Sequence, residues 1–143
     1  MAYRFLEDTA TADTAFEVWN SSIEGLFTDA ADAMLNVMLH DINTVKNEHQ
    51  ISFETQDDSI EMLLFNVLQE LIFQKDAHQY LFRIKKCTIR DDGNRHFFNG
   101  IFIGEHLDFL RHQIIVDVKA VTLHNYFVKK ENQLWRTQII LDI

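Results

Sequence analysis

The chain has 143 residues, of which 22 are acidic and 13 basic, and its formal net charge is −9. Proteins bind phosphate backbones through Lys and Arg, so we expect this acidic chain to make no direct contact with nucleic acid. Two explanations of the negative charge remain open: it favours docking on a basic protein, or it serves only solubility. The sequence has no run of about 18 apolar residues, which argues against a membrane helix, and no secretory signal, which argues against secretion. Cys87 is the only cysteine, which argues against internal disulfides. Together these features predict a cytoplasmic protein.

The hydrophobic pattern predicts two short strands and then a helix in the first part of the chain. The strands are expected at residues 3–6 and 14–19. Ser21 with Glu24 forms a capping box, which predicts that a helix starts here. Apolar residues then recur at helical spacing along one stripe, which is typical of a helix packed on a core. This stripe consists of Ile23, Leu26, Phe27, Ala30, Ala31, Met34, Val37 and Met38.

A second helix is predicted from Asp58–Ser59, after a short strand that contains Ile51 and Phe53. No linker, repeat or low-complexity tract interrupts the chain, so a single domain over residues 1–143 is expected. The stripe of the second helix consists of Ile60, Leu63, Leu64, Val67, Leu68, Leu71 and Ile72.

The remaining residues have the alternating pattern of strands. Residues 79–90 and 95–103 predict a hairpin, with Asp-Gly in the turn between them. A long strand is predicted at 113–128 and a turn at 129–132. The last strand is predicted to run from Trp135 to the final residue. The expected fold class is α+β: two main helices packed on a largely antiparallel β-sheet in one compact domain.

Most enzyme signatures are missing from the sequence. It has no G-x-S-x-G elbow, phosphate-binding loop, dinucleotide fingerprint or H-E-x-x-H motif. The seven histidines are scattered, and each is expected to be a surface or structural residue. Cys87 is interpreted as a small strand residue. No catalytic residue is therefore predicted.

Acidic groups at the two ends of the chain are a candidate cation site. Glu7, Asp8 and Asp13 lie near the start, and Asp142 and the carboxylate of Ile143 lie at the end. If the first and last segments pair in a sheet, these oxygens converge, and clustered carboxylates are stabilised by hard cations such as Ca²⁺ or Mg²⁺. The alternative is a solvated acidic surface.

Several short strings, spread over the whole chain, resemble the archease family. Their order and spacing are more specific than any single string. Two residues are inserted between Leu6 and Thr11 relative to the family pattern, a family His has no clear counterpart there, and Leu123 replaces an aromatic residue. The matching strings are Tyr3-Arg4-Phe5-Leu6-Glu7, Thr11-Ala12-Asp13 with Trp19 six residues later, Ser22-Ile23-Glu24-Gly25-Leu26-Phe27, Leu63-Leu64, Gln69-Glu70-Leu71, Gly104-Glu105, Asp108, Arg111-His112, Val118-Lys119-Ala120-Val121-Thr122-Leu123-His124, and Trp135 through Ile140-Leu141-Asp142-Ile143.

The resemblance implies a non-catalytic helper of an RtcB-type tRNA-splicing RNA ligase. An archease promotes guanylation and multiple turnover of that ligase and binds a divalent cation, usually calcium. By motif match the metal ligands here are Asp13, Asp142 and Ile143, the last through backbone or terminal oxygens. Lys119 is expected to supply a mobile cation that contacts the nucleotide-loading cleft of the ligase.

Two other functions remain as alternatives to this hypothesis. A stand-alone metal-dependent hydrolase needs an open coordination position and a positioned base, for which the sequence has no motif. A chaperone-like interaction module is suggested by the twelve Phe and the Met-bearing first helix, although core filling explains both. The oligomeric state and the RNA substrates have no signal in the sequence.

Overall fold

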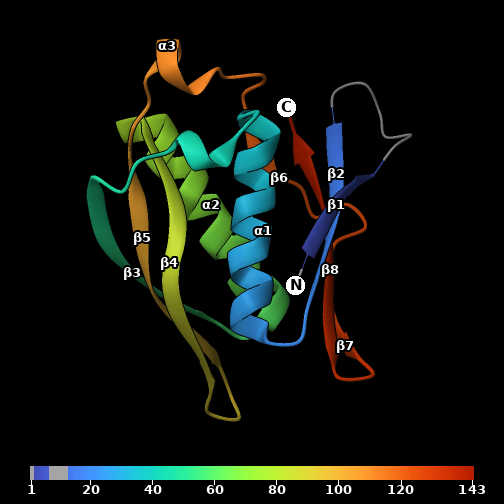
Figure 1. The fold of residues 1–143 in the computed structure, drawn as a ribbon. Helices are drawn as coiled ribbons and strands as arrows, with labels where there is room; N and C mark the ends of the chain where they lie inside the picture. The colour runs from blue at the N-terminus through green and yellow to red at the C-terminus, as the bar shows by residue number, and fades with distance from the viewer. Residues whose placement is uncertain (1, 7–12) are drawn as a thin grey trace.

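The computed structural model describes residues 2–6 and 13–143, and Figure 1 shows the order of its elements in space. Within the described residues, no helix is both long enough and apolar enough to cross a bilayer. The elements are β1 (Ala2–Leu6), β2 (Asp13–Asn20), α1 (Ile23–Met38), η1 (Ile42–Thr44), β3 (His49–Asp57), α2 (Ile60–His78), β4 (Tyr80–Asp91), β5 (His96–His106), α3 (Phe109–His112), β6 (Ala120–Val121), β7 (Phe127–Glu131) and β8 (Leu134–Asp142).

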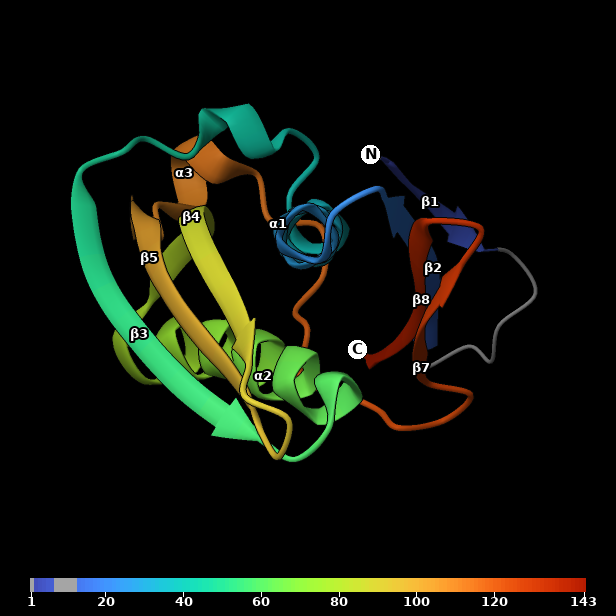
Figure 2. The ribbon, with the colours of Figure 1, turned by 90° about the horizontal axis from the view of Figure 1, so that it is seen from below.

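The described strands form two antiparallel sheets, where one sheet was expected. One sheet has the order β1-β2-β8-β6, with β7 also paired to β8, and the other has the order β3-β5-β4. Helix α1 lies between the two sheets, and α2 packs on the three-stranded sheet (Figure 2). The predicted α+β class, with two main helices on antiparallel strands, is therefore confirmed, and one hydrophobic cluster joins both sheets and both helices.

Both long helices start at a serine cap. The Ser22 hydroxyl accepts a hydrogen bond from the Gly25 N–H at 3.0 Å, so the cap lies one residue after the predicted Ser21. The Ser59 hydroxyl accepts from the Met62 N–H at 3.1 Å, as the predicted start of the second helix requires. The predicted stripes are buried almost throughout, with only their first residues half-exposed.

The predicted hairpin is the pair β4–β5. Gly93 in its turn has φ +93°, a conformation that favours glycine. The Asp92 carboxylate accepts from the N–H groups of Asn94 and Arg95 at 2.9 and 2.8 Å and closes the turn. An irregularity between Ile84 and Lys86 places one extra residue in β4 opposite β5.

The long strand predicted at residues 113–128 is wrong. This segment contains only the two-residue strand β6 and the first two residues of β7, and it otherwise crosses from one sheet to the other as an extended connection. Isolated backbone hydrogen bonds hold this segment instead of a continuous β-ladder; for example, the Ile115 N–H donates to the Met38 carbonyl at 2.8 Å. The alternation of Ile114, Val116 and Val118 arises because one side of this extended connection packs on the core.

The last hairpin turns later than predicted. Residues 129–131 belong to β7, and the turn consists of Asn132 and Gln133, which have φ of 51° and 65°. This pair of left-handed residues matches the right-handed twist of the flanking strands. In β8, Thr137, Ile139 and Leu141 are buried on one face.

Candidate functional site

The start of β2 and the end of β8 lie side by side at one end of the five-stranded sheet. Strands β2 and β8 are antiparallel, and Asp13 is the register partner of Asp142. Side chains of directly opposed residues share one face of a sheet, with Cβ atoms about 5 Å apart. Figure 1 shows the carboxyl end beside the start of β2. The pairing of the first and last segments, on which the predicted site depends, is therefore present.

Ile143 and Lys119 lie at the same place. The backbone N–H of Lys119 donates to the carbonyl of Asp142 at 2.8 Å, and the Lys119 side chain is exposed. The half-buried side chain of Ile143 packs against the hydrophobic core, which positions the backbone beside Asp142. We call Asp13, Lys119, Asp142 and Ile143 the tip site.

The donors of the tip site have the chemistry of a hard-cation site. Carboxylate oxygens are the ligands that Ca²⁺ prefers, and like charges directly opposite each other in a sheet are destabilising without a cation. Among the described residues, no three side chains of His, Cys, Asp or Glu come close enough to hold a metal ion. Glu7, Asp8 and the string Thr11-Ala12 lie outside the described residues.

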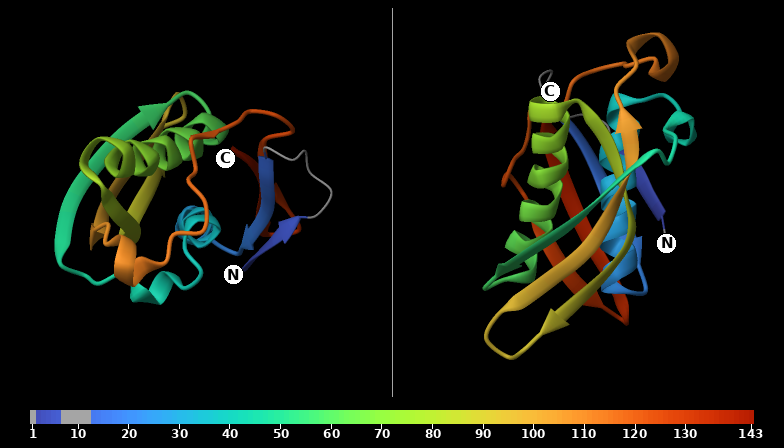
Figure 3. Two further views of the ribbon diagram at one scale, coloured as in Figure 1. Left: turned by 90° about the horizontal axis from the view of Figure 1, so that it is seen from above. Right: turned by 90° about the vertical axis from the view of Figure 1, so that its left-hand side faces the viewer.

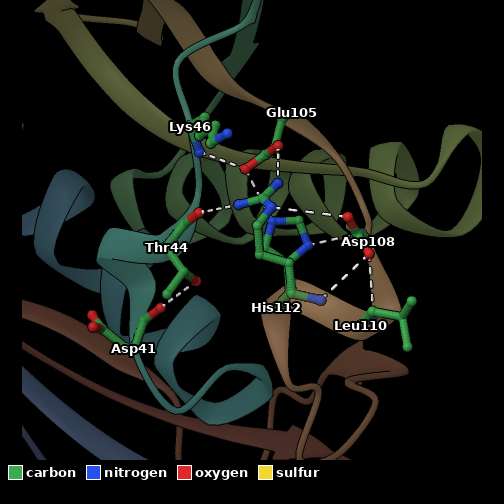
Figure 4. Close-up of polar contacts among 8 residues, drawn as sticks. Asp41, Thr44, Lys46, Glu105, Asp108, Leu110 and His112 are labelled. Carbon is green, nitrogen blue, oxygen red and sulfur yellow. Dashed lines mark hydrogen bonds and ion pairs between the residues drawn. The ribbon is translucent and has the colours of Figure 1, made fainter.

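A buried polar network holds the loop that follows β5 (Figure 4). Glu105 is only 4% exposed, and its carboxylate accepts the Lys46 N–H at 2.6 Å, the Arg111 guanidinium, and the His112 Nε2–H at 3.0 Å. Arg111 also donates to the Thr44 carbonyl at 2.7 Å. These bonds join the segment around η1 to α3.

His112 is held as the neutral Nε2–H tautomer. Its Nδ1 accepts the Asp108 N–H at 2.8 Å, so Nδ1 carries no proton and Nε2 donates to Glu105. Burial alone raises the pKa of Glu105, but the hydrogen bonds from Lys46, His112 and Arg111 outweigh burial and lower the pKa to about 2. A structural role thus explains the imidazole that the sequence left without a function.

Helix α3 presents apolar side chains to solvent at the same end of the molecule as the tip site (Figure 1). Phe109 is 67% exposed and Leu110 is 95% exposed, while Asp108 caps the helix through the Leu110 N–H at 3.1 Å. A shallow depression of about 660 Å³ borders this helix, and Lys46 and His49 also line it. Exposed apolar side chains held on a fixed backbone are typical of a protein contact.

Sequence reasoning predicted residues that the structure brings together at the tip site, but it did not predict the buried network. Glu105, Asp108, Arg111 and His112 were noted only as part of a family-like string. A Glu in an otherwise apolar strand, followed by Arg-His, is a signal for a buried charge with partners, because lone buried carboxylates are too costly.

The comparisons with known proteins show which family the chain resembles. Residues 3–143 match the family described as the Archease protein family (MTH1598/TM1083). The protein archease of Methanopyrus kandleri is 31% identical over 136 residues, which cover 93% of this chain and 94% of that protein. The protein archease of Archaeoglobus fulgidus is 28% identical over 143 residues, which cover 100% of both.

Solved structures share the fold. The solution structure of Methanobacterium thermoautotrophicum protein 1598 has a TM-score of 0.83 and 29% identity, and it covers 99% of this chain and 98% of that one. The crystal structure of an archease from Thermotoga maritima has a TM-score of 0.58 and 18% identity, and the match covers 94% of this chain and 93% of that one. None of these relatives bears the name of an enzyme. The chain belongs to the archease family.

Proposed function

We propose that this protein is a non-catalytic activator of an RtcB-type tRNA-splicing RNA ligase in the cytoplasm. It promotes guanylation of the ligase and multiple turnover by means of a divalent cation, calcium, held at the tip site by Asp13, Asp142 and Ile143. The observation that carries the proposal is the register pair of Asp13 with Asp142, which supports convergence of oxygens from both ends of the chain.

The cation and Lys119 act together in this proposal. Lys119 is exposed and directly precedes β6 at the edge of the five-stranded sheet, so its amine can reach past the sheet edge toward a partner. A bound cation and a nearby ammonium group both stabilise the charge of a triphosphate, which is the main requirement of nucleotidyl transfer. Together they would reshape the nucleotide-loading cleft of the ligase when the tip enters it.

Helix α3 supplies the apolar part of the contact. Phe109 and Leu110 are exposed at the same end as the tip site, and the Glu105 network fixes the loop that carries them. A preorganised apolar contact gives affinity at a lower entropic cost than a mobile loop. The acidic chain would also be attracted to a basic ligase.

The decisive measurement is RNA ligation at limiting ligase, scored for more than one turnover. Wild-type protein should restore turnover in the presence of calcium, and Asp142→Asn should reduce turnover to that of the ligase alone. Calcium affinity, measured by calorimetry, should fall at least about tenfold, because even indirect partners of a metal cost that much when removed. Asp58→Asn is the matched control, since that exposed carboxylate lies on another part of the chain and makes a 3.5 Å ion pair with the exposed Arg95.

Two results would contradict the proposal. Full activation by Asp13→Asn and Asp142→Asn would remove the cation from the mechanism. Unchanged activation by a chain extended beyond Ile143 would remove its terminal carboxylate from the ligand set. Turnover of RNA or nucleotide by this protein with metal but without ligase would instead favour the metal-dependent hydrolase.

A chaperone-like module is the second candidate, favoured by the 95% exposure of Leu110. The Thermotoga maritima structure is that of an archease described as a possible chaperone. A general chaperone would suppress aggregation of unrelated unfolded proteins, and Leu110→Ser would abolish that effect. Suppression limited to the ligase would assign the exposed side chain to the specific complex instead.

A further inference from the structure

The outer face of the three-stranded sheet β3-β5-β4 concentrates positive charge in an acidic chain. Four of the 13 basic residues lie on β4 between Arg83 and Arg90. Arg83 is bound to Asp32 of α1 through bonds of 2.9 and 3.0 Å. Among the described residues, no carboxylate forms an ion pair with the remaining Lys85, Lys86 and Arg90, so their charge faces solvent.

The extra residue in β4 places two lysines side by side on this face. Lys86 is the register partner of Ile101, and Lys85 is the residue that has no partner in β5. The Lys85 ammonium lies 3.4 Å from the Gln50 amide oxygen on β3, so the side chain crosses the outer face. Without the extra residue, consecutive lysines would point to opposite faces.

An aromatic ring and side-chain amides accompany these cations. The Arg90 guanidinium lies 4.2 Å above the centre of the half-exposed Phe97 ring. The Asn99 amide lies between two shallow pockets of about 290 and 270 Å³ and donates to Glu54 at 2.9 Å. Among the register partners of Phe97, Asn99, Ile101 and Ile103 on β3 and β4, Glu54 carries the one carboxylate.

The face is open to solvent. Figure 3 (right) views the molecule from the side of this sheet, and no helix in the described part of the chain crosses in front of it. Helix α2 packs on the opposite face, where Phe98 and Phe102 are buried. An open antiparallel sheet with aromatic rings and flanking cations is the arrangement that binds two or three unpaired bases in sheet-type RNA-binding modules.

We propose that this outer face is a contact surface for single-stranded RNA. Lys85, Lys86 and Arg90 bind phosphates, a base stacks on Phe97 and its guanidinium, and the amide of Asn99 hydrogen-bonds to a base edge. An acidic protein segment would use only the cations, whereas RNA could also use the ring and the amide, so RNA fits the whole set better. This inference goes beyond ligase activation and does not depend on it.

The test is fluorescence anisotropy of a labelled uridine-rich 12-nucleotide RNA with the full chain and no ligase. We expect a Kd on the order of 10⁻⁵ M at 50 mM salt. Three phosphate contacts on a single strand predict a slope of about −2 in log affinity against log salt, and hence about a 20-fold loss between 50 and 200 mM.

Variants separate charge from stacking. Combined Lys85→Gln, Lys86→Gln and Arg90→Gln should abolish salt-dependent binding. Phe97→Leu should weaken binding at least about fivefold while leaving the salt slope unchanged. The matched control, Lys129→Gln with Lys130→Gln, removes two exposed cations from β7 of the other sheet and should bind as the wild type does. Thermal unfolding of each variant verifies that it folds.

Three outcomes would overturn the proposal. These are no measurable binding at 50 mM salt, an equal loss in the β7 control, and competition by polyglutamate as strong as that by unlabelled RNA. The last would assign the face to an acidic protein partner.

Discussion

Replacing Glu105 by Gln removes the buried charge that joins η1 to α3 while keeping the shape of the side chain. The pKa of Glu105 falls from 4.5 to about 2 on folding, despite burial, because three donors face the carboxylate. At about 1.4 kcal/mol for each pH unit, ionisation of this group stabilises the folded state by about 3 kcal/mol at neutral pH. A Gln amide would also point an N–H at one of these donors. We therefore expect Glu105→Gln to lower the free energy of unfolding by about 3 kcal/mol at pH 7.

The pH dependence has a definite sign. Because the folded pKa is depressed, the unfolded chain binds the proton first as pH falls, and the stabilisation by Glu105 is lost as pH decreases from about 5 toward 2. With the two pKa values above, about 1.4 kcal/mol remains at pH 3. The difference in unfolding free energy between the wild type and Glu105→Gln should therefore shrink over this range.

Urea unfolding followed by fluorescence of Trp19 and Trp135 measures both quantities. Glu131→Gln is the control, because that exposed carboxylate makes surface ion pairs that contribute less than about 1 kcal/mol. A Glu105→Gln protein within about 0.5 kcal/mol of the wild type at pH 7, or a difference that does not change down to pH 3, would refute the reasoning.

Two further substitutions have expected outcomes that follow from single contacts. Gly104→Ala should prevent stable folding, because a Cβ there would lie 1.8 Å from the Leu81 carbonyl oxygen. Recovery of soluble protein with wild-type circular dichroism would contradict this. As a control, Gly93→Ala in the open turn should lower the free energy of unfolding by only about 1 kcal/mol. Tyr126→Phe should lower the free energy of unfolding by about 1–2 kcal/mol in urea titrations, since it removes the 2.6 Å hydrogen bond to the Glu61 carbonyl. Burial raises the pKa of the Tyr126 phenol, so ultraviolet titration should show this phenol un-ionised at pH 11. Ionisation of Tyr126 at pH 10 would disprove its burial.

The proposed RNA contact on the outer face of β3-β5-β4 depends on the local arrangement of charge, which the net charge of the chain does not describe. A net charge of −9 led to the expectation that this chain does not bind nucleic acid. Charge acts over about 8–10 Å at physiological salt, so the arrangement of the nearest groups matters more than the sum. The extra residue that turns Lys85 and Lys86 to one face depends on how β4 pairs with β5.

The sequence by itself determined the elements whose signals are local. The stripes of α1 and α2, the cap at Ser59 and the Asp-Gly turn each depend on residues within a few positions of one another. The resemblance of short strings then identified the tip residues, and the register of Asp13 with Asp142 agrees with that choice.

Only the tertiary structure decided how the strands divide into two sheets and what residues 113–128 do. Alternation shows that one side of an extended segment is buried, but it does not show whether the backbone pairs in a ladder or crosses between sheets. The partners of Glu105 come from separate segments, so its burial and its depressed pKa arise only once η1, β5 and α3 pack together. Contacts between distant segments have no local pattern, and packing of the whole chain selects them.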